Sequence, residues 1–517
     1  MHRYLYFTVF VSGMTTLAIE LSASRLIGSV FGTSNLVWAS IIGLILIYLA
    51  LGYFLGGRWA DRSPQPRTMY LILTWGALTA GLVPLIAKPV LRLAANAFDR
   101  LELGVLFGSF SVVLILFILP VTLLGTVSPF AIRIAITDPQ EAGRISGRIY
   151  AISTIGSFLG TFLPVLVFIP LVGTLMTFFI FSEALILVAL IGLWKATDWR
   201  SALAWIWAPV LLAALTLYAG RGAIKDTRGQ IYEGESAYNY IQVLQIGEYR
   251  YLRLNEGQGI HSMWHPTLIG FDGPWRQFLA APFFNAPEYG PERVRNIAIV
   301  GLAAGTTARQ ATAVFGPIEI DGFEIDPEII EVGRQYFDMN MPNLNAIARD
   351  GRVGLELSRQ RYSIIAIDAY RPPYIPWHLT TIEFFQIVRE RLEEDGTAVV
   401  NVGRSPTDRR LIDGLVATLQ TVFSSVYVMD VPNTFNSIIY ATVRPTSIEN
   451  LYANLLYLYT RQDVHPLLIQ AIETMISHQE PLQPAAQVFT DDLAPIEWIT
   501  NRMVLNFVLL GEVEDLE

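Results

Sequence analysis

Three acidic residues, Glu324, Asp350 and Asp368, each stand near the end of an apolar segment in the C-terminal half of the chain. Upstream of them, Gly301 and Gly305 follow the apolar run IAIV. Glycine lets the backbone turn tightly beneath a ligand, and the helix after it offers free N–H groups. Carboxylates at strand ends can bind ribose hydroxyls and an adenine amino group, the roles we expect for Glu324 and Asp350. This pattern predicts a nucleoside site, with Asp368 facing the reacting centre.

Alternating strands and helices must position these residues. Strands are predicted at 297–301, 318–325, 364–368, 398–402, 426–429 and 438–443, and helices at 307–315, 327–339, 381–394 and 408–423. Apolar strands with intervening helices predict a doubly wound, Rossmann-like sheet of the class I methyltransferase type. Its last two strands, separated only by a turn, should be antiparallel. Before it, 240–246 and 249–254 flank Gly247 and predict a β-hairpin subdomain.

The N-terminal half has the composition of a membrane domain. Hydrophobic residues make up 52% of the 517 residues and charged residues 16%, with a mean hydropathy of +0.42. Seven spans are predicted, at 4–30, 36–57, 69–87, 103–135, 148–170, 173–194 and 202–219. We therefore expect a polytopic α-helical membrane domain at 1–220, a β-hairpin subdomain at 221–295, a Rossmann-like domain at 296–445, and a C-terminal helical segment at 446–517.

The distribution of Lys and Arg places one set of short loops in the cytoplasm. Seven spans would then put the C-terminal half on the outer side, whereas a nucleotide-type co-substrate is normally cytosolic. The last apolar segment, which contains Pro209, is the candidate for an interfacial helix instead of a span. The sequence does not decide on which side of the membrane the soluble domain lies. Glu20 and Glu183 lie inside predicted spans and are either functional groups or members of structural ion pairs.

Several classes of function have no support in the composition. The net charge is −9, and the chain has no long basic run, so we expect no nucleic-acid partner. Cysteine is absent, which excludes disulfides, thiolate catalysis and cysteine-ligated metals. His261 and His265 have no third possible ligand at a spacing typical of metal sites, so no metal site is predicted.

Three segments carry a resemblance to a known family. They are ESAYNYIQV from Glu235, DAYRPPYIPWHLTTIEFF from Asp368, and FTDDLAPIEW from Phe489 to Trp498. Together they resemble the spermidine synthase (polyamine aminopropyltransferase) superfamily. The resemblance is nearest to its membrane-fused branch, in which a multi-helix domain precedes the synthase-like domain. It implies an integral protein of a prokaryotic plasma membrane, in contact with the lipid bilayer.

The resemblance also implies a reaction. In this family an amine attacks the propyl carbon of decarboxylated S-adenosylmethionine, and a carboxylate takes the amine's proton. Asp368 matches the catalytic base, Glu324 the ribose acid and Asp350 the adenine-side acid. The implied partners are a small-molecule amine or polyamine and, because soluble relatives dimerise through their N-terminal hairpins, a second copy of the chain. No metal is implied.

This chain departs from the soluble synthases at four positions. Ala304 replaces the glycine-loop acid that holds the donor's amine, and Arg371 replaces the acid that grips the acceptor. Asn239 replaces a glutamine, and Trp275 falls near the catalytic tyrosine. When a cation replaces a carboxylate about 4 Å from a substrate ammonium group, attraction becomes repulsion and the interaction energy changes by several kcal/mol. A standard diamine site at these positions is therefore not expected.

Three alternatives remain open from the residues. Asp491 and Asp492 supply the missing negative charge, or the co-substrate is intact S-adenosylmethionine and the protein a methyltransferase, or the site binds a nucleoside without catalysis in a transporter-like membrane protein. Other candidates for the substrate pocket are His378 and two tyrosines, Tyr238 and Tyr240, which should share one face of a strand.

Overall fold

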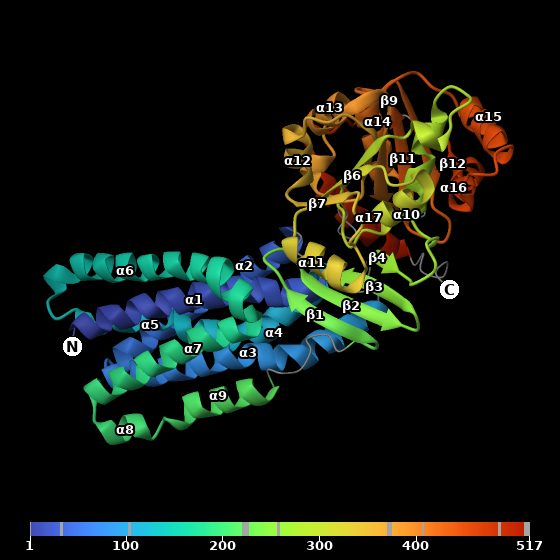
Figure 1. The fold of residues 1–517 in the computed structure, drawn as a ribbon. Helices are drawn as coiled ribbons and strands as arrows, with labels where there is room; N and C mark the ends of the chain where they lie inside the picture. The colour runs from blue at the N-terminus through green and yellow to red at the C-terminus, as the bar shows by residue number, and fades with distance from the viewer. Residues whose placement is uncertain are drawn as a thin grey trace. The chain divides into compact units, whose positions relative to one another are not determined.

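The computed structural model describes residues 2–31, 35–101, 105–219, 227–255, 259–369, 375–405, 408–483 and 487–510. The chain divides into two compact units (Figure 1). The first contains Met1–Arg228 together with the short segment Glu233–Tyr240, and the second contains Gly229–Tyr232 and Ile241–Glu517.

The first unit is built from helices. Its elements are α1 (His2–Phe31), α2 (Asn35–Arg62), α3 (Pro66–Leu101), α4 (Val105–Gly125), α5 (Val127–Ala135), η1 (Pro139–Glu141), α6 (Ala142–Leu163), η2 (Pro164–Phe168), α7 (Ile169–Ala196), α8 (Trp199–Leu203) and α9 (Trp207–Ala219). Within the described residues, six stretches are long and apolar enough to cross a membrane. One of them, Pro139–Ala196, is 58 residues long and contains the predicted spans 148–170 and 173–194. Gly173, with a φ of 80°, interrupts the helix between these two predicted spans.

Glycines allow the helices of this unit to approach closely. A Cβ atom added at Gly156 would lie 2.0 Å from the carbonyl oxygen of Phe10, and one at Gly160 the same distance from that of Met14. Between α2 and α4, a Cβ at Gly52 would lie 2.4 Å from the carbonyl oxygen of Thr122. Only glycine fits these distances, so Gly52, Gly156 and Gly160 let the helices pack closely, as small residues do between membrane helices.

The segment Glu233–Tyr240 is held by this helical unit. The Glu235 carboxylate accepts hydrogen bonds from the backbone N–H of Thr174, at 2.8 Å, and from its hydroxyl, at 2.7 Å. Thr174 directly follows the break at Gly173, where helical N–H groups lack intrahelical partners. Arg25 of α1 donates to the backbone carbonyls of Ser236 and Ala237. Side chains of two helices thus fix the short connection between β1 and β2.

A small antiparallel sheet has the strand order β1-β2-β3-β4. Its strands are β1 (Gln230–Glu235), β2 (Tyr240–Ile246), β3 (Tyr249–Leu254) and β4 (Ile260–Trp264). The predicted hairpin is confirmed, since β2 pairs with β3 from Ile241 opposite Leu254 to Ile246 opposite Tyr249. Gly247 adopts a φ of 62° in the turn, the backbone region that glycine enters most easily.

The large sheet has eight strands in the order β12-β10-β11-β9-β8-β5-β6-β7. These are β5 (Asn296–Val300), β6 (Glu319–Glu324), β7 (Leu344–Ala348), β8 (Tyr362–Ile367), β9 (Leu392–Gly403), β10 (Ser425–Asp430), β11 (Asn436–Thr442) and β12 (Gln479–Glu480). The five strands from β9 to β7 are parallel, whereas β11 is antiparallel to both β9 and β10. The predicted doubly wound sheet with an antiparallel end is confirmed.

Helices cover both faces of this sheet. One apolar core includes residues of η3 (Trp275–Phe284), α10 (Thr306–Phe315), α15 (Ile448–Tyr459) and α16 (Pro466–Ser477). The other includes residues of α12 (Gly351–Leu357), α13 (Ile382–Glu390), α14 (Arg410–Gln420) and α17 (Ile496–Leu510). A third core joins the small sheet to α11 (Pro327–Tyr336), while η4 (Pro291–Arg293) and η5 (Trp377–Leu379) are single turns.

One predicted boundary is wrong. The helix expected over 381–394 ends at Glu390, and β9 begins at Leu392. Glu393, Glu394 and Asp395 extended the helical pattern in the sequence, but they lie at the entrance of β9.

Candidate functional site at the strand ends

The carboxyl ends of the parallel strands bring the predicted acids to one edge of the sheet. In the strand register, Val300 pairs with Phe323 on one side and Ile367 on the other, and Ile367 pairs with Val400. The next residue along each strand is Gly301, Glu324, Asp368 or Asn401. These four residues therefore occupy one row, which is the position where doubly wound sheets bind their ligands.

The glycine loop between β5 and α10 has the backbone geometry that its sequence predicts. Gly301 and Gly305 have φ values of 88° and 83°, and Ala303 also has a positive φ, of 48°. A Cβ atom at Gly301 would lie 2.6 Å from the backbone nitrogen of Ala369 and the carbonyl oxygen of Asp368. Glycine is thus required both by the turn and by the close approach of the β8 end.

The small sheet supports this loop. The backbone N–H of Ala304 donates to the Ser262 hydroxyl at 2.9 Å. The Thr306 hydroxyl lies 2.9 Å from the backbone nitrogen of Met263 and 3.0 Å from its carbonyl oxygen. Strand β4 therefore fixes the start of α10, where the first N–H groups of the helix lack intrahelical partners.

Glu324 lies at the end of β6 and is only 8% exposed. Its carboxylate accepts hydrogen bonds from the backbone N–H of Ala303, at 3.0 Å, and of Asp326, at 3.2 Å. A carboxylate oxygen has more than one lone pair and can accept a hydroxyl beside a backbone N–H. The glycine loop and the Glu324 side chain are thus directly connected.

Asp368 follows β8 and is held by an amide. Asn401 donates from Nδ2 to Asp368 Oδ1 at 2.8 Å, and Asn401 Oδ1 accepts from Asn436 Nδ2 at 2.9 Å. Burial raises the pKa of the Asp368 carboxyl to about 7, and the hydrogen bond from Asn401 opposes part of this rise. A carboxyl that titrates near neutral pH can exchange a proton with a ligand under physiological conditions.

Asp350 precedes α12 and already has two partners. It accepts a hydrogen bond from the backbone N–H of Val353 at 3.1 Å, as the N-cap of the helix. Its other oxygen lies 3.0 Å from Nε2 of His378. The hydrogen bond with His378, aided by that from Val353, lowers the pKa of the Asp350 carboxyl. His378, predicted as a pocket residue, therefore contacts a predicted nucleoside acid.

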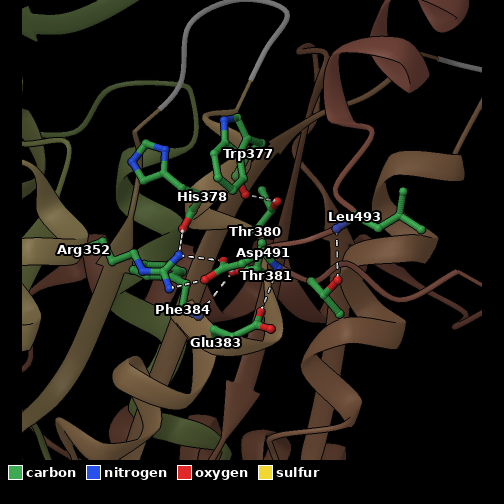
Figure 2. A network of polar contacts seen from close by, with 10 residues as sticks. Arg352, Trp377, His378, Thr380, Thr381, Glu383, Phe384, Asp491 and Leu493 are labelled. Atoms are coloured by element: carbon green, nitrogen blue, oxygen red, sulfur yellow. Dashed lines mark hydrogen bonds and ion pairs between the residues drawn. The ribbon is translucent and has the colours of Figure 1, made fainter.

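Asp491 has its charge compensated. Figure 2 shows its carboxylate between Arg352 and the start of α13. Arg352 donates to both of its oxygens, at 2.8 and 2.6 Å, and the Thr381 hydroxyl donates at 2.7 Å. These bonds argue against Asp491 as the missing acid for a substrate ammonium. Asp492 next to it is exposed.

The two pocket tyrosines do not share a strand face, which corrects that prediction. The Ser236 hydroxyl accepts from the backbone N–H groups of Tyr238 and Asn239, and the resulting turn ends before β2 begins at Tyr240. Tyr238 is 40% exposed, whereas Tyr240 is 3% exposed and donates to Glu233 at 2.6 Å. Arg371, the remaining pocket candidate, lies outside the described residues.

Sequence reasoning missed Asn401, Ser262 and Arg352. Asn401 carried a signal, because it is a polar residue in the apolar run AVVNV at the end of a predicted strand. Ser262 and Arg352 gave no signal in the sequence, because their partners are distant in the chain. Ser262 bonds Ala304, and Arg352 bonds Asp491.

Comparisons with known proteins agree with this arrangement. The model of the spermine/spermidine synthase domain matches residues 283–451. A probable polyamine aminopropyl transferase of Bifidobacterium longum is 30% identical over 281 residues, which are 52% of this chain and 61% of the relative. Residues 283–451 are a spermine/spermidine synthase domain. This chain spans less than two thirds of that relative's length.

The synthase domain contains the row of Gly301, Glu324, Asp368 and Asn401, and also Asp350. It excludes the small sheet and Asp491. Polyamine aminopropyltransferase 2 of Aquifex aeolicus is 22% identical over 80% of this chain and 81% of its own length. Residues 229–517 make up little more than half of the chain, so that alignment extends into the helical unit. A solved structure of a probable spermidine synthase from Corynebacterium glutamicum is 18% identical, covers 51% of this chain and 98% of its own, and has a TM-score of 0.39.

Proposed function

We propose that the chain is a membrane-anchored, spermidine synthase-like transferase that moves an aminopropyl group from decarboxylated S-adenosylmethionine to an amine. The observation that carries this proposal is Asp368, a carboxyl with a pKa of about 7 in the row of strand-end residues of a synthase domain. The co-substrate is taken as a diffusible reactant, and no metal takes part in the proposal.

The donor's nucleoside is proposed to bind along that row. Glu324 would accept the ribose hydroxyls while its two backbone hydrogen bonds hold it in place. Asp350 would accept the adenine amino group, and Gly301 and Gly305 would let the backbone pass beneath the nucleoside. The N–H groups at the start of α10 would face its polar atoms.

Asp368 would act as the base of the reaction. An amine is protonated at neutral pH and has no lone pair until the proton leaves. Asp368 takes this proton, the nitrogen lone pair attacks the propyl carbon next to sulfur, and the carbon–sulfur bond breaks. The sulfur keeps the bonding electrons and leaves as the neutral thioether methylthioadenosine. A carboxylate with a pKa near 7 is a better proton acceptor than one with the usual value.

The acceptor side differs from a standard diamine site. Asp491 already pairs with Arg352, which leaves His378 and Asp492 as proposed acceptor contacts within the second unit. An acceptor with fewer cationic groups than a diamine would suit this set, because charge–charge attraction is reduced.

Anchoring in a lipid bilayer is part of the proposal. Six apolar stretches of the described chain are long enough to cross the hydrocarbon core. Their exposed surface carries large apolar side chains that water would not favour, such as Phe54 at 73% and Leu171 at 77% exposed. The bilayer would cover these side chains.

Methyl transfer from intact S-adenosylmethionine is the second candidate. Ala304 favours it, because this residue is 3% exposed and provides no carboxylate for the donor's amine. The same strand-end acids would bind the nucleoside in either reaction. The two reactions differ in the nucleoside product, which is methylthioadenosine for aminopropyl transfer and S-adenosylhomocysteine for methyl transfer.

The experiment uses membranes that carry the full-length chain and have been washed at alkaline pH. Each donor is supplied with a panel of amines, and the nucleoside product is identified by mass spectrometry. We expect one methylthioadenosine per new carbon–nitrogen bond, with the activity retained in the pellet. Asp368→Asn should lower the rate by about 10²–10⁴-fold, whereas Asp272→Asn, at a side chain that is 94% exposed, should not. S-adenosylhomocysteine would favour methyl transfer, activity in the wash would contradict anchoring, and ligand binding without any product would favour a non-catalytic site.

A further inference from the structure

The C-terminal segment 489–493 is bound to the nucleoside side of the synthase domain through Asp491. Arg352 and Asp491 form a two-bond ion pair, at 2.8 and 2.6 Å, although 139 residues separate them in the chain. The Arg352 side chain is 20% exposed and that of Asp491 38% exposed. Such forked pairs fix both distance and orientation, which a single point contact does not.

Three further hydrogen bonds hold the segment at the start of α13. The backbone N–H of Ile382 donates to the carbonyl of Phe489 at 2.9 Å. The Thr381 hydroxyl donates to Asp491 at 2.7 Å, and the backbone N–H of Asp491 donates to Glu383 at 3.0 Å. Thr381 is also the N-cap of α13. Figure 2 shows that the contacts of Arg352, Thr381 and Glu383 converge on Asp491.

Arg352 links this segment to Asp350. It lies two residues beyond Asp350, in the first turn of α12, and also donates to the backbone carbonyl of His378 at 3.1 Å. The His378 ring in turn contacts the Asp350 carboxylate at 3.0 Å. The carboxylates of Glu383 and Glu356 also act on Arg352, but Asp491 is the one that binds its guanidinium with two hydrogen bonds.

We propose that Asp491 is a positioning residue that draws Arg352 away from Asp350 and so keeps the Asp350 carboxylate available for the amino group of an adenine-type nucleoside. This inference rests on the proposed nucleoside site. Asp491 touches no reacting atom in it and acts through Arg352. Without Asp491, Arg352 would neutralise Asp350 and compete with the amino group of the ligand.

The test compares two thioether nucleosides that differ at one group. Methylthioadenosine carries the amino group, whereas methylthioinosine carries at the same position an oxo group, which accepts hydrogen bonds and cannot donate one to Asp350. Calorimetry on the detergent-solubilised full chain gives both dissociation constants. We expect the unmodified protein to prefer methylthioadenosine by about tenfold, the value of one hydrogen bond to a charged group. Asp491→Asn should remove most of this preference, and adding Arg352→Gln to it should restore the preference.

The control is Asp272→Asn, which removes one negative charge from a side chain that is 94% exposed and lies outside the proposed site, and it should leave the preference unchanged. Should Asp491→Asn fail to fold, Thr381→Val removes one bond to Asp491 and should reduce the preference by a smaller factor. An unchanged preference in Asp491→Asn, or no recovery in the double variant, overturns the role of Asp491 alone. Equal binding of both nucleosides by the unmodified protein overturns the role of Asp350 as well. Binding of neither overturns the nucleoside site on which the inference rests.

Discussion

Asp368 gives the site a pH dependence. Its carboxyl has a pKa of about 7, above the usual 3.8, because it is buried. The base must be ionised to accept a proton, so kcat/KM should rise about tenfold per pH unit below pH 7 and then level off. In Asp368→Asn this rise of kcat/KM with pH, the acidic limb of the profile, should disappear. Initial rates at low donor concentration between pH 5.5 and 9 would measure it.

Comparing the unmodified protein with Asp368→Asn separates the ionisation of Asp368 from that of the amine substrate. The amine acceptor also ionises, but its contribution is the same in both proteins. Asn401→Ala provides a second check, since loss of its hydrogen bond should move the limb to higher pH. An identical pH profile in the unmodified protein and in Asp368→Asn would show that another group is the base.

The same pKa has a consequence for stability. The folded state holds the proton of Asp368 more tightly than the unfolded state, whose pKa is near 3.8. The protonated carboxyl therefore contributes stability below about pH 4, and this contribution is lost as the pH rises to about 7. The ionised form that the proposed reaction needs is the less stable one, as is common for groups at functional sites.

At the scale of residues, strand-end positions were predictable and side-chain partners were not. Glu324, Asp350 and Asp368 could be predicted because parallel strands end at one edge. Tyr238 could not be placed, because the Ser236 hydroxyl forms a turn that interrupts the alternation of the strand. The pairing of Asp491 with Arg352 was equally invisible, since it joins segments that only the complete fold brings together.

At the scale of elements, the glycine loop is set by two separate constraints. Gly301 has a φ of 88°, and an added Cβ atom would lie 2.6 Å from the backbone at the end of β8. Gly316 has a similar φ, of 82°, but an added Cβ atom would have nothing within 4 Å. A substitution at Gly316 therefore introduces backbone strain alone, whereas one at Gly301 introduces both strain and a steric clash.

We expect Gly316→Ala to cost about 1–3 kcal/mol from strain alone, because its φ of 82° and ψ of −169° lie in a region that is almost restricted to glycine. Gly301→Ala should cost more than Gly316→Ala, because β8 must also move, and it should weaken nucleoside binding. The midpoint of thermal unfolding in detergent and a nucleoside titration measure both effects. Equal losses of stability in the two variants, with nucleoside binding intact, would mean that the close approach to Asp368 is unimportant.

Elements with a strong pattern were predicted well. The hairpin of β2 and β3 carries a glycine turn between alternating residues, and β5, β6, β8 and β9 contain apolar runs, so local chemistry and overall fold agree. Strand β7 was not among the predicted strands, and it has no fully buried residue. The end of α13 was mispredicted because Glu393 and Glu394 favour a helix, whereas they belong to β9, where the register with β8 shifts between the pairs Tyr362–Leu392 and Ile364–Thr397. Tertiary pairing overrides local preference at such boundaries.

At the scale of the whole molecule, a helical unit of membrane-compatible length is joined to a synthase domain in one chain. The hydrophobic pattern predicted both halves, and the break at Gly173 lies between two predicted spans. The pattern could not predict that Glu235 would bind Thr174, because no periodicity links residues 61 positions apart. The account of function depends on a single claim, that the strand-end acids bind one nucleoside together.

The most direct test is a structure of the full-length protein with methylthioadenosine bound. The account predicts that Glu324 accepts both ribose hydroxyls, that Asp350 accepts the adenine amino group, and that Asp368 lies on the sulfur side of the ligand. A nucleoside bound away from the row of Gly301, Glu324 and Asp368, or one that contacts only one of the three acids, would contradict the account.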